Sequence, residues 1–343
     1  MRTSEKGSLT VIHPKFFFLI LIVTVLTTLS GNALAYYDDF PDQHAPLGVM
    51  GDHLHDPGEL MFSYRYSRMA MAGNRDGDDR ASTSSVLADF MVAPTDMDME
   101  MHMLGAMYGV NDQFTVMAML PFVRKTMDHV TGGGAHFTTR SDGLGDIKIS
   151  ALYSLFENES HRVHMTAGLS IPTGSIKERG TTPMGDVRLP YPMQRGSGTW
   201  DLLPGLTYRG KHERLTWGLQ AQGTIRPHSN KRHYRLGNQY EVSSWGAWRW
   251  TNWISTSARL VWSQTFNIEG ADGALMPMVV PTADPKLRAG RRLDLLLGVN
   301  LAPRGFAEGH RLAIEVGPPV YQHLDGPQLE TDWKLVVGWQ WGF

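Results

Sequence analysis

Apolar and polar residues alternate along the last segment of the chain, TDWKLVVGWQWGF, residues 331–343. Successive side chains of an extended strand point to opposite faces, so this alternation predicts a strand with one apolar face and one small or polar face. An apolar face of this kind points into the core of a soluble sandwich, or toward lipid in an outer-membrane barrel. The apolar, largely aromatic face comprises Trp333, Leu335, Val337, Trp339, Trp341 and Phe343.

The same two-residue period recurs along the chain, for example in residues 163–171, 215–222 and 293–301. We identify about twelve segments of this kind, each bounded by turn residues and long enough for a strand. They begin near Gly58, Thr95, Phe114, Gly143, His161, Gly198, Arg214, Leu236, Trp253, Arg291, Arg311 and Thr331.

The links between these segments alternate in length. Tight turns occur at VNDQ, ENES, GKHE, TN and PRGFAEGH, whereas longer links include residues 73–94, 131–142, 174–197 and 270–290. Short periplasmic turns and long outer loops are typical of transmembrane barrels, and a soluble sandwich has no reason to alternate them. The sequence therefore predicts an all-β fold, a transmembrane antiparallel β-barrel of about 12 strands in the bacterial outer membrane, with both termini in the periplasm.

The N-terminus has the three parts of a secretory signal peptide. Basic residues precede an apolar run at residues 16–25, and a stretch of small residues, SGNALA, ends at Ala35. The run is short for a membrane span of about 20 residues, which argues against an uncleaved anchor. We therefore expect a signal peptide at residues 1–35, a periplasmic N-terminal segment or plug at 36–57, and the outer-membrane barrel at 58–343.

The composition of the chain excludes several kinds of partner and metal site. The formal net charge is only −2, so nothing indicates a nucleic-acid partner. The chain has no cysteine, which removes disulfides, iron–sulfur clusters and thiolate zinc sites. We expect no cofactor, and we expect outer-membrane lipid around the apolar faces.

Methionine occupies every second position of MDMEMHM, residues 97–103. The lipid-facing residues predicted in this strand and its two neighbours have the opposite parity, so the methionines are predicted to face the lumen. Asp98, Glu100 and His102 then lie on the outer face, which requires that end of the strand to rise beyond the lipid, because ionised groups there cost about 2–4 kcal/mol near the midplane. The reversed parity would put the methionines on lipid. The inward set, called the methionine wall, comprises Met61, Met69, Met71, Met97, Met99, Met101, Met103, Met107, Met117, Met119 and Met127.

Three explanations of the methionine wall remain open. Methionine is unbranched and fills irregular space in a narrow barrel, and its thioether also contacts varied apolar or aromatic permeants. Thioethers are in addition suitable ligands for soft cations such as Cu(I) and Ag(I). The candidate ligand-binding residues are Met69, Met71, Met97, Met99, Met101, Met103, Met117 and Met119, with Arg65 and Lys125 as inward-facing charges.

Two segments outside the strands carry further candidates. His53 and His55, flanked by Asp52 and Asp56, are candidate ligands for a divalent metal, and a solvated tail or barrel-end cap is the alternative. The outer loop ADGALMPMVVPTADP, residues 271–285, is unusually apolar, so we expect it to fold into the mouth or to contact a hydrophobic ligand.

An enzyme is the least favoured class. Some twelve-stranded barrels are lipases, with a histidine and a serine two residues apart on one face of a strand. Here His228 and Ser229 are adjacent, so their side chains would point to opposite faces of an extended strand. No G-x-S-x-G sequence occurs either. We therefore expect no catalytic residues.

Several stretches resemble the family described as putative MetA-pathway of phenol degradation. They are APLGVMGDHLH, MFSYRYSRM, GNRDG, MHMLGAMYG, GLGDIKISALY, GLSIPTGSI and YPMQRGSGTWDLLPG. The resemblance implies an outer-membrane barrel that passes a small hydrophobic or aromatic molecule. A structural or soft-metal (copper or silver) surface barrel without an open pore is the alternative function.

The C-terminal residue has an expected role of its own. A terminal Phe preceded by alternating aromatics resembles the closing strand of bacterial outer-membrane barrels, so Phe343 is the expected signal for the barrel-assembly machinery.

Overall fold

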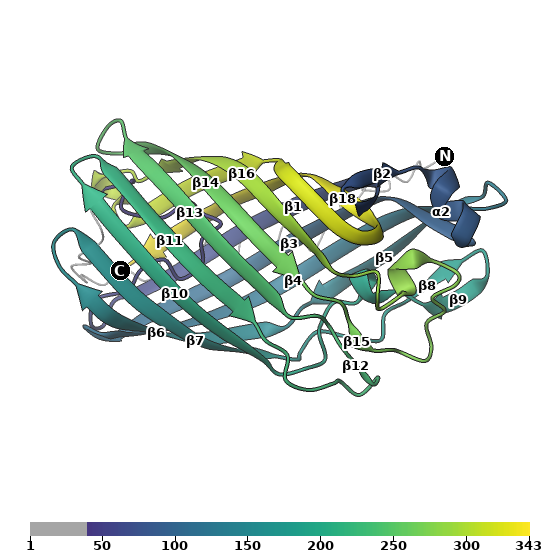
Figure 1. The fold of residues 1–343 in the computed structure, drawn as a ribbon. Coiled ribbons are helices and arrows are strands. Elements are labelled where there is room, and N and C mark those ends of the chain that lie inside the picture. Colours follow the sequence, from purple (N-terminus) through teal and green to yellow (C-terminus); the bar gives the residue numbers. More distant parts are fainter. Residues whose placement is uncertain (1–39) are drawn as a thin grey trace, which may run out of the picture. The chain divides into compact units, whose positions relative to one another are not determined.

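The protein folds into a closed antiparallel β-barrel (Figure 1). The structure is a computed structural model that describes residues 40–343. Each barrel strand pairs with the next along the chain and the last pairs with the first, which confirms the predicted all-β barrel of twelve strands. The predicted signal peptide lies outside the described residues. The strands are β1 (Leu60–Gly77), β3 (Val92–Asn111), β4 (Phe114–Thr131), β6 (Ile147–Glu157), β7 (His161–Ile171), β10 (Asp201–His212), β11 (Leu215–Thr224), β13 (Gln239–Arg249), β14 (Ile254–Thr265), β16 (Gly290–Leu301), β17 (His310–Gly317) and β18 (Pro319–Gly342).

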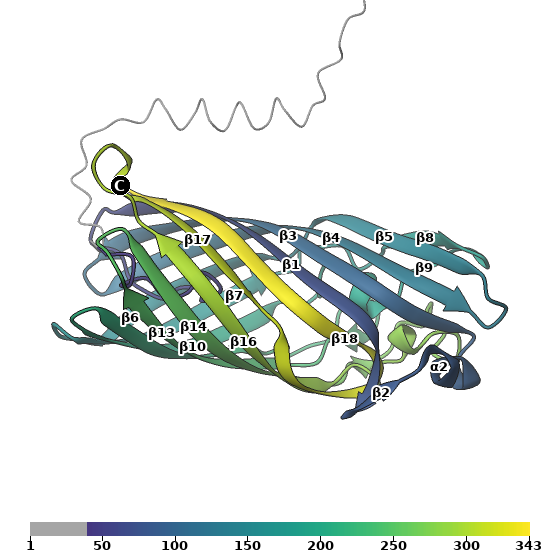
Figure 2. The same cartoon turned by 90° about the horizontal axis from the view of Figure 1, so that it is seen from above.

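The barrel closes between its first and last strands (Figure 2). The backbone N–H of Leu60 donates to the carbonyl of Phe343 at 2.9 Å, and the N–H of Phe343 donates to the carbonyl of Leu60 at 3.0 Å. The alternating aromatics of β18 stack along its outer face, with the Trp341 and Phe343 rings 4.5 Å apart. Closure leaves no strand edge unpaired, which a membrane-spanning sheet requires.

Most predicted strand starts agree with the observed ones to within a few residues, but β18 begins at Pro319 and the predicted start near Thr331 is wrong. Strand β17 is short, so the outer end of β16 is left to pair with the first part of β18, from Gly290 opposite Leu324 to Leu293 opposite Tyr321. The polar sequence of that part hides its strand character.

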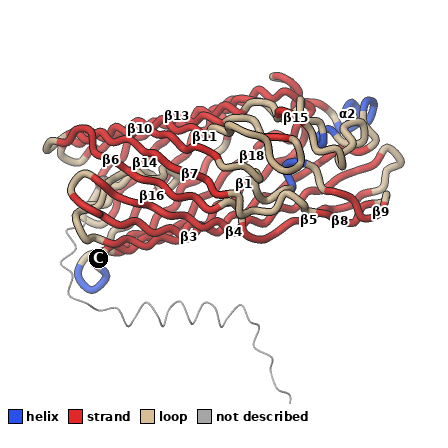
Figure 3. The backbone as a smooth tube through the Cα atoms, turned by 90° about the horizontal axis from the view of Figure 1, so that it is seen from below, coloured by secondary structure: helices blue, strands red, loops and turns tan. Residues whose placement is uncertain are grey.

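The long links carry structure of their own at the end of the barrel opposite the C-terminus (Figures 1 and 3). The link expected at residues 131–142 is largely a strand, β5 (His136–Leu144), which pairs with the outer half of β4 beyond the end of β6. No helix in residues 40–343 is long and apolar enough to cross a membrane. The other elements are β2 (Asp79–Ala81), α2 (Thr83–Asp89), β8 (Arg179–Thr182), β9 (Gly185–Arg188), η1 (Tyr191–Met193), β12 (Tyr234–Arg235), β15 (Glu269–Gly270), η2 (Pro281–Ala283) and η3 (Gly305–Ala307).

Side chains of the strands alternate between an apolar exterior and a mixed interior. Leu104 and Leu206 are each 51% exposed on the outer face, whereas inward-facing Met61 and Thr115 are almost fully buried. This is the pattern of a barrel whose outer surface meets lipid. The interior is filled by segments that fold inward from both ends, and these segments determine the candidate site.

Candidate functional site

The methionine wall lies on the inner face of β1, β3 and β4, where its members are cross-strand partners. Met71 is opposite Met97, which is opposite Met127, and Met69 is opposite Met99. The intervening residues of β3 face outward: Arg68 Nη2 pairs with Asp98 at 2.8 Å, and the Tyr66 hydroxyl donates to Glu100 at 2.8 Å. The outward acids therefore have partners on the same face.

The two ends of the methionine wall pack against two different inward-folded segments. At the end near the C-terminus, Met61, Met107, Met117 and Met119 form a buried cluster with Leu152, against which Met50 and Leu54 pack. At the other end, Met97 and Met127 form a buried cluster with Leu189 and Met193 of the loop before β10. Packing therefore accounts for both ends of the wall.

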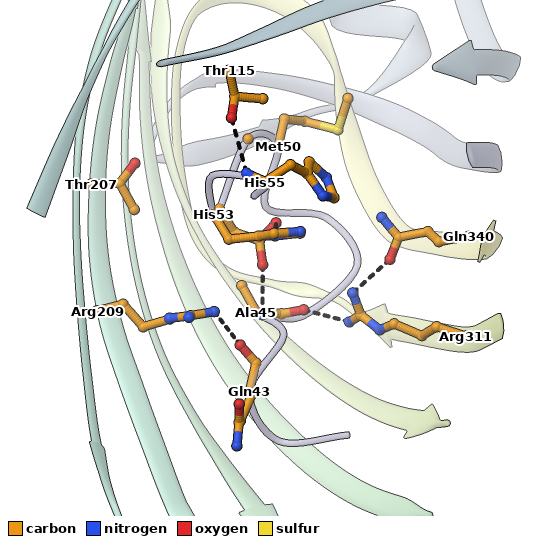
Figure 4. Close-up of polar contacts among 12 residues, drawn as sticks. Gln43, Ala45, Met50, His53, His55, Thr115, Thr207, Arg209, Arg311 and Gln340 are labelled. Carbon is orange, nitrogen blue, oxygen red and sulfur yellow. Dashed lines mark hydrogen bonds and ion pairs between the residues drawn. The ribbon is translucent and has the colours of Figure 1, made fainter. Parts of the chain in front are cut away.

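The first of these segments, residues 40–57, lies inside the barrel (Figure 4). Buried Arg311 binds the Ala45 carbonyl at 2.5 Å, Thr115 accepts from the His55 backbone N–H at 2.9 Å, and Gln220 donates to the Met50 carbonyl at 2.9 Å. Inward-facing polar side chains of the strands thus satisfy the backbone of a segment that has no regular structure. Arg65, predicted as a luminal charge, contacts the Met50 sulfur and holds the same segment.

The rings of the predicted histidine pair, His53 and His55, pack edge to face with centroids 4.7 Å apart, but their polar partners differ. His53 lies with His44 and Asp52, and one ligand atom from each of these three buried residues lies within 4.8 Å of the others. Burial would raise the pKa of Asp52, but His53, His44 and Arg311 hold that pKa well below its usual value. His55 instead contacts Glu59 at 2.9 Å, so the residues that could share a metal are His44, Asp52 and His53. Metal binding itself stays a prediction.

Two adjoining cavities occupy the lumen between the inward-folded segments. One, of ≈ 410 Å³, is lined by Met101, Met103, Met117 and Met119 on one side and by polar side chains of β11, β13 and β14 on the other. The second, of ≈ 390 Å³, shares Met101 and Lys148 with the first and adds cationic side chains. The middle of the methionine wall therefore faces open space.

A third cavity, of ≈ 330 Å³, lies among the outer loops. The apolar loop 271–285 lines it, as expected, together with the β8–β9 hairpin and the outer ends of β3 to β5. Sequence reasoning missed the contributions of the hairpin, although apolar residues within a long loop were an available signal. The apolar lining comprises Met91, Val92, Phe137, Pro183, Met184, Val187, Leu189, Pro190, Ala274, Leu275, Met276, Val279, Val280 and Ala283.

One short stretch borders both the outer and the luminal cavities. Leu189 and Pro190 line the outer cavity, whereas Tyr191, Pro192 and Gln194 line the second luminal one, so residues 189–194 border both and are called the constriction segment.

The constriction segment is tied to the wall by polar contacts. Lys125 donates to the carbonyls of Pro192 at 2.8 Å and of Gln194 at 2.5 Å, and Ser141 donates to the carbonyl of Met193 at 2.7 Å. Lys125, predicted as a ligand-binding charge, thus holds this segment in place.

These features define a bacterial outer-membrane β-barrel with two segments folded into its lumen. The chain belongs to the family described as putative MetA-pathway of phenol degradation, whose model matches residues 75–316. No curated protein matches the chain.

Several solved structures are similar to this chain. An outer membrane channel from Pseudomonas putida F1 is 14% identical, with 86% of this chain and 99% of that one covered and a TM-score of 0.58, which shows the same fold. A FadL homologue of Pseudomonas aeruginosa is 12% identical over 91% of this chain and 96% of that one, with a TM-score of 0.47. The toluene transporter TodX of P. putida is 11% identical over 83% and 90%, with a TM-score of 0.44.

Proposed function

We propose that this barrel passes a small hydrophobic or aromatic molecule across the outer membrane. The observation that carries the proposal is the apolar outer cavity, which shares the constriction segment as a border with the luminal cavity that Met101 lines. An apolar molecule partitions into the outer cavity because its surface leaves water there. Displacement of the constriction segment then lets the molecule move from the outer cavity to Met101 and Met103, whose thioethers contact rings of different shapes favourably.

Binding of the fluorescent probe N-phenyl-1-naphthylamine to the refolded protein tests this proposal. Replacing Leu275 and Met276, which line the outer cavity, by asparagine is expected to weaken binding about tenfold, because burial of one such side chain is worth about 1.5–3 kcal/mol. Met278 lies in the same loop but is 76% exposed and does not line the cavity, so Met278→Asn is the matched control. Equal affinity in both variants, or no binding by the unaltered protein, contradicts the proposal.

Capture of a soft cation is the second candidate function. Met99 lies opposite Met69, Met101 and Met119 line the same luminal cavity, and cross-strand neighbours lie about 5 Å apart, so these sulfurs share the inner surface of the barrel. Replacing Met99, Met101 and Met119 by leucine keeps the approximate volume and removes the sulfur. Loss of Ag(I) binding in this triple variant supports metal handling, and no Ag(I) binding in the unaltered protein eliminates it.

A catalytic role is not part of the proposal. His228 accepts a hydrogen bond from the Trp200 backbone N–H at 3.4 Å, in a loop rather than on a strand face beside a serine. Esterase activity of the refolded protein in detergent would contradict this view.

A further inference from the structure

Lys148 has an unusual position in the barrel interior. It lies on β6 directly opposite Met119 of β4 and Ser170 of β7, on the inward face, and it lines both luminal cavities. Within residues 40–343, no carboxylate forms an ion pair with its ammonium group, and no hydrogen bond satisfies it. A cation in a confined space is stabilised strongly by an anion that can reach it.

Most other charged groups around the second luminal cavity have partners; Arg288 also lines it, and its Nη1 has no hydrogen-bond partner within the described residues. Arg226 pairs with Asp201 at 3.2 Å, and Arg195 pairs with Glu178 at 2.9 Å. The Asp146 carboxylate accepts from the backbone N–H groups of Gly174 and Ser197 at 2.8 and 2.7 Å. Glu241 lines the first cavity with Lys148, but the lining of the two cavities together holds six Lys and Arg side chains and three Asp and Glu side chains, so positive charge is in excess beside the methionines.

We propose that the luminal cavity binds an apolar molecule that carries a single carboxylate, such as an aromatic carboxylate. Lys148 binds the carboxylate, and Met101, Met103 and Met119 contact the apolar body. The side chains of Met119 and Lys148 start about 5 Å apart as cross-strand neighbours, so one small molecule reaches both. This inference rests on the proposed function and names the substrate class within it.

Three probes of similar size test the charge requirement: benzoate, benzyl alcohol and benzylammonium. Their affinities for the refolded full-length protein are measured by calorimetry at constant ionic strength. Benzoate is expected to bind about tenfold more tightly than benzyl alcohol, because only benzoate accepts a charge-assisted hydrogen bond from Lys148. Benzylammonium is expected to bind more weakly than either, because its positive charge is repelled by that of Lys148.

Variants at Lys148 assign the effect to this side chain. Lys148→Met is expected to abolish the preference for benzoate over benzyl alcohol, whereas Lys148→Arg keeps the preference. Lys231→Met, an exposed loop lysine outside the luminal cavities, is the control for loss of one positive charge. The shift in gel mobility on heating confirms that each variant is folded.

The failures of the two proposals differ. Equal binding of benzoate and benzyl alcohol by the unaltered protein overturns the carboxylate inference and leaves a hydrophobic channel. A preference for benzoate that survives in Lys148→Met also overturns it. Absence of binding for every aromatic probe overturns the proposed function itself.

Discussion

Replacing Lys125 by methionine is expected to release the constriction segment. The Lys125 ammonium donates to the carbonyls of Pro192 and Gln194, at 2.8 and 2.5 Å, and methionine at this inward position matches its neighbour Met127. Strand β4 therefore keeps an apolar inner face, and the variant removes the two hydrogen bonds without disturbing the barrel.

The free energy lost in Lys125→Met depends on the contacts that still hold the constriction segment. A hydrogen bond to a charged group contributes about 1.5–3 kcal/mol, and water in the lumen replaces part of that for a freed carbonyl. Ser141 still holds the Met193 carbonyl at 2.7 Å, and Met193 still packs on Met97 and Met127. A net loss of about 2 kcal/mol raises the displaced population of the segment roughly 30-fold.

Single-channel recording in planar bilayers measures this change directly. Lys125→Met should show open events roughly 30-fold more often than the unaltered protein, whereas Lys177→Met, at an exposed position of the same loop, should show none of this increase. Identical traces for Lys125→Met and the unaltered protein would mean that residues 189–194 do not control passage.

Three further predictions concern the barrel and its N-terminal segment. Arg259→Met leaves the buried Glu315 carboxylate without its 2.7 Å partner, so the free energy of unfolding, measured by urea titration in detergent, should fall by about 3–5 kcal/mol; an unchanged urea midpoint would refute this. Deletion of Phe343 should lower the amount of protein in the outer membrane more than refolding in detergent, and equal membrane levels would count against its role as an assembly signal. His53→Ala should abolish calorimetric Zn²⁺ binding whereas His55→Ala retains it, and absence of Zn²⁺ binding in the unaltered protein removes the site.

The sequence predicts what repeats with a two-residue period. Strand positions, the alternation of long and short links and the inward parity of the methionines all follow from side chains that alternate between two faces. The start of β18 could not be predicted this way, because its first part pairs with β16 only where the short β17 has ended. That pairing depends on the relative lengths of three strands and has no local signal.

Contacts of the inward-folded segments could not be predicted for a different reason. The partners of Lys125 are backbone carbonyls of Pro192 and Gln194, far away in the chain and in a loop without periodicity. In the same way, the His53 ring contacts both His44 and His55, with ring centroids 5.0 and 4.7 Å away, and the contact with His44 depends on an irregular turn. Every residue has a backbone carbonyl, so neither composition nor spacing identifies these hydrogen-bond partners in advance.

The position of each methionine along its strand distinguishes between the explanations of the methionine wall that composition left open. A segment that docks and leaves must form and lose apolar contacts, and unbranched methionine refills the vacated space more readily than β-branched residues do. Met117 and Met97, at the two ends, contact such segments and are explained by packing. Met101 lies between the ends, belongs to neither buried cluster and lines both luminal cavities, so it is the position at which a permeant would meet sulfur.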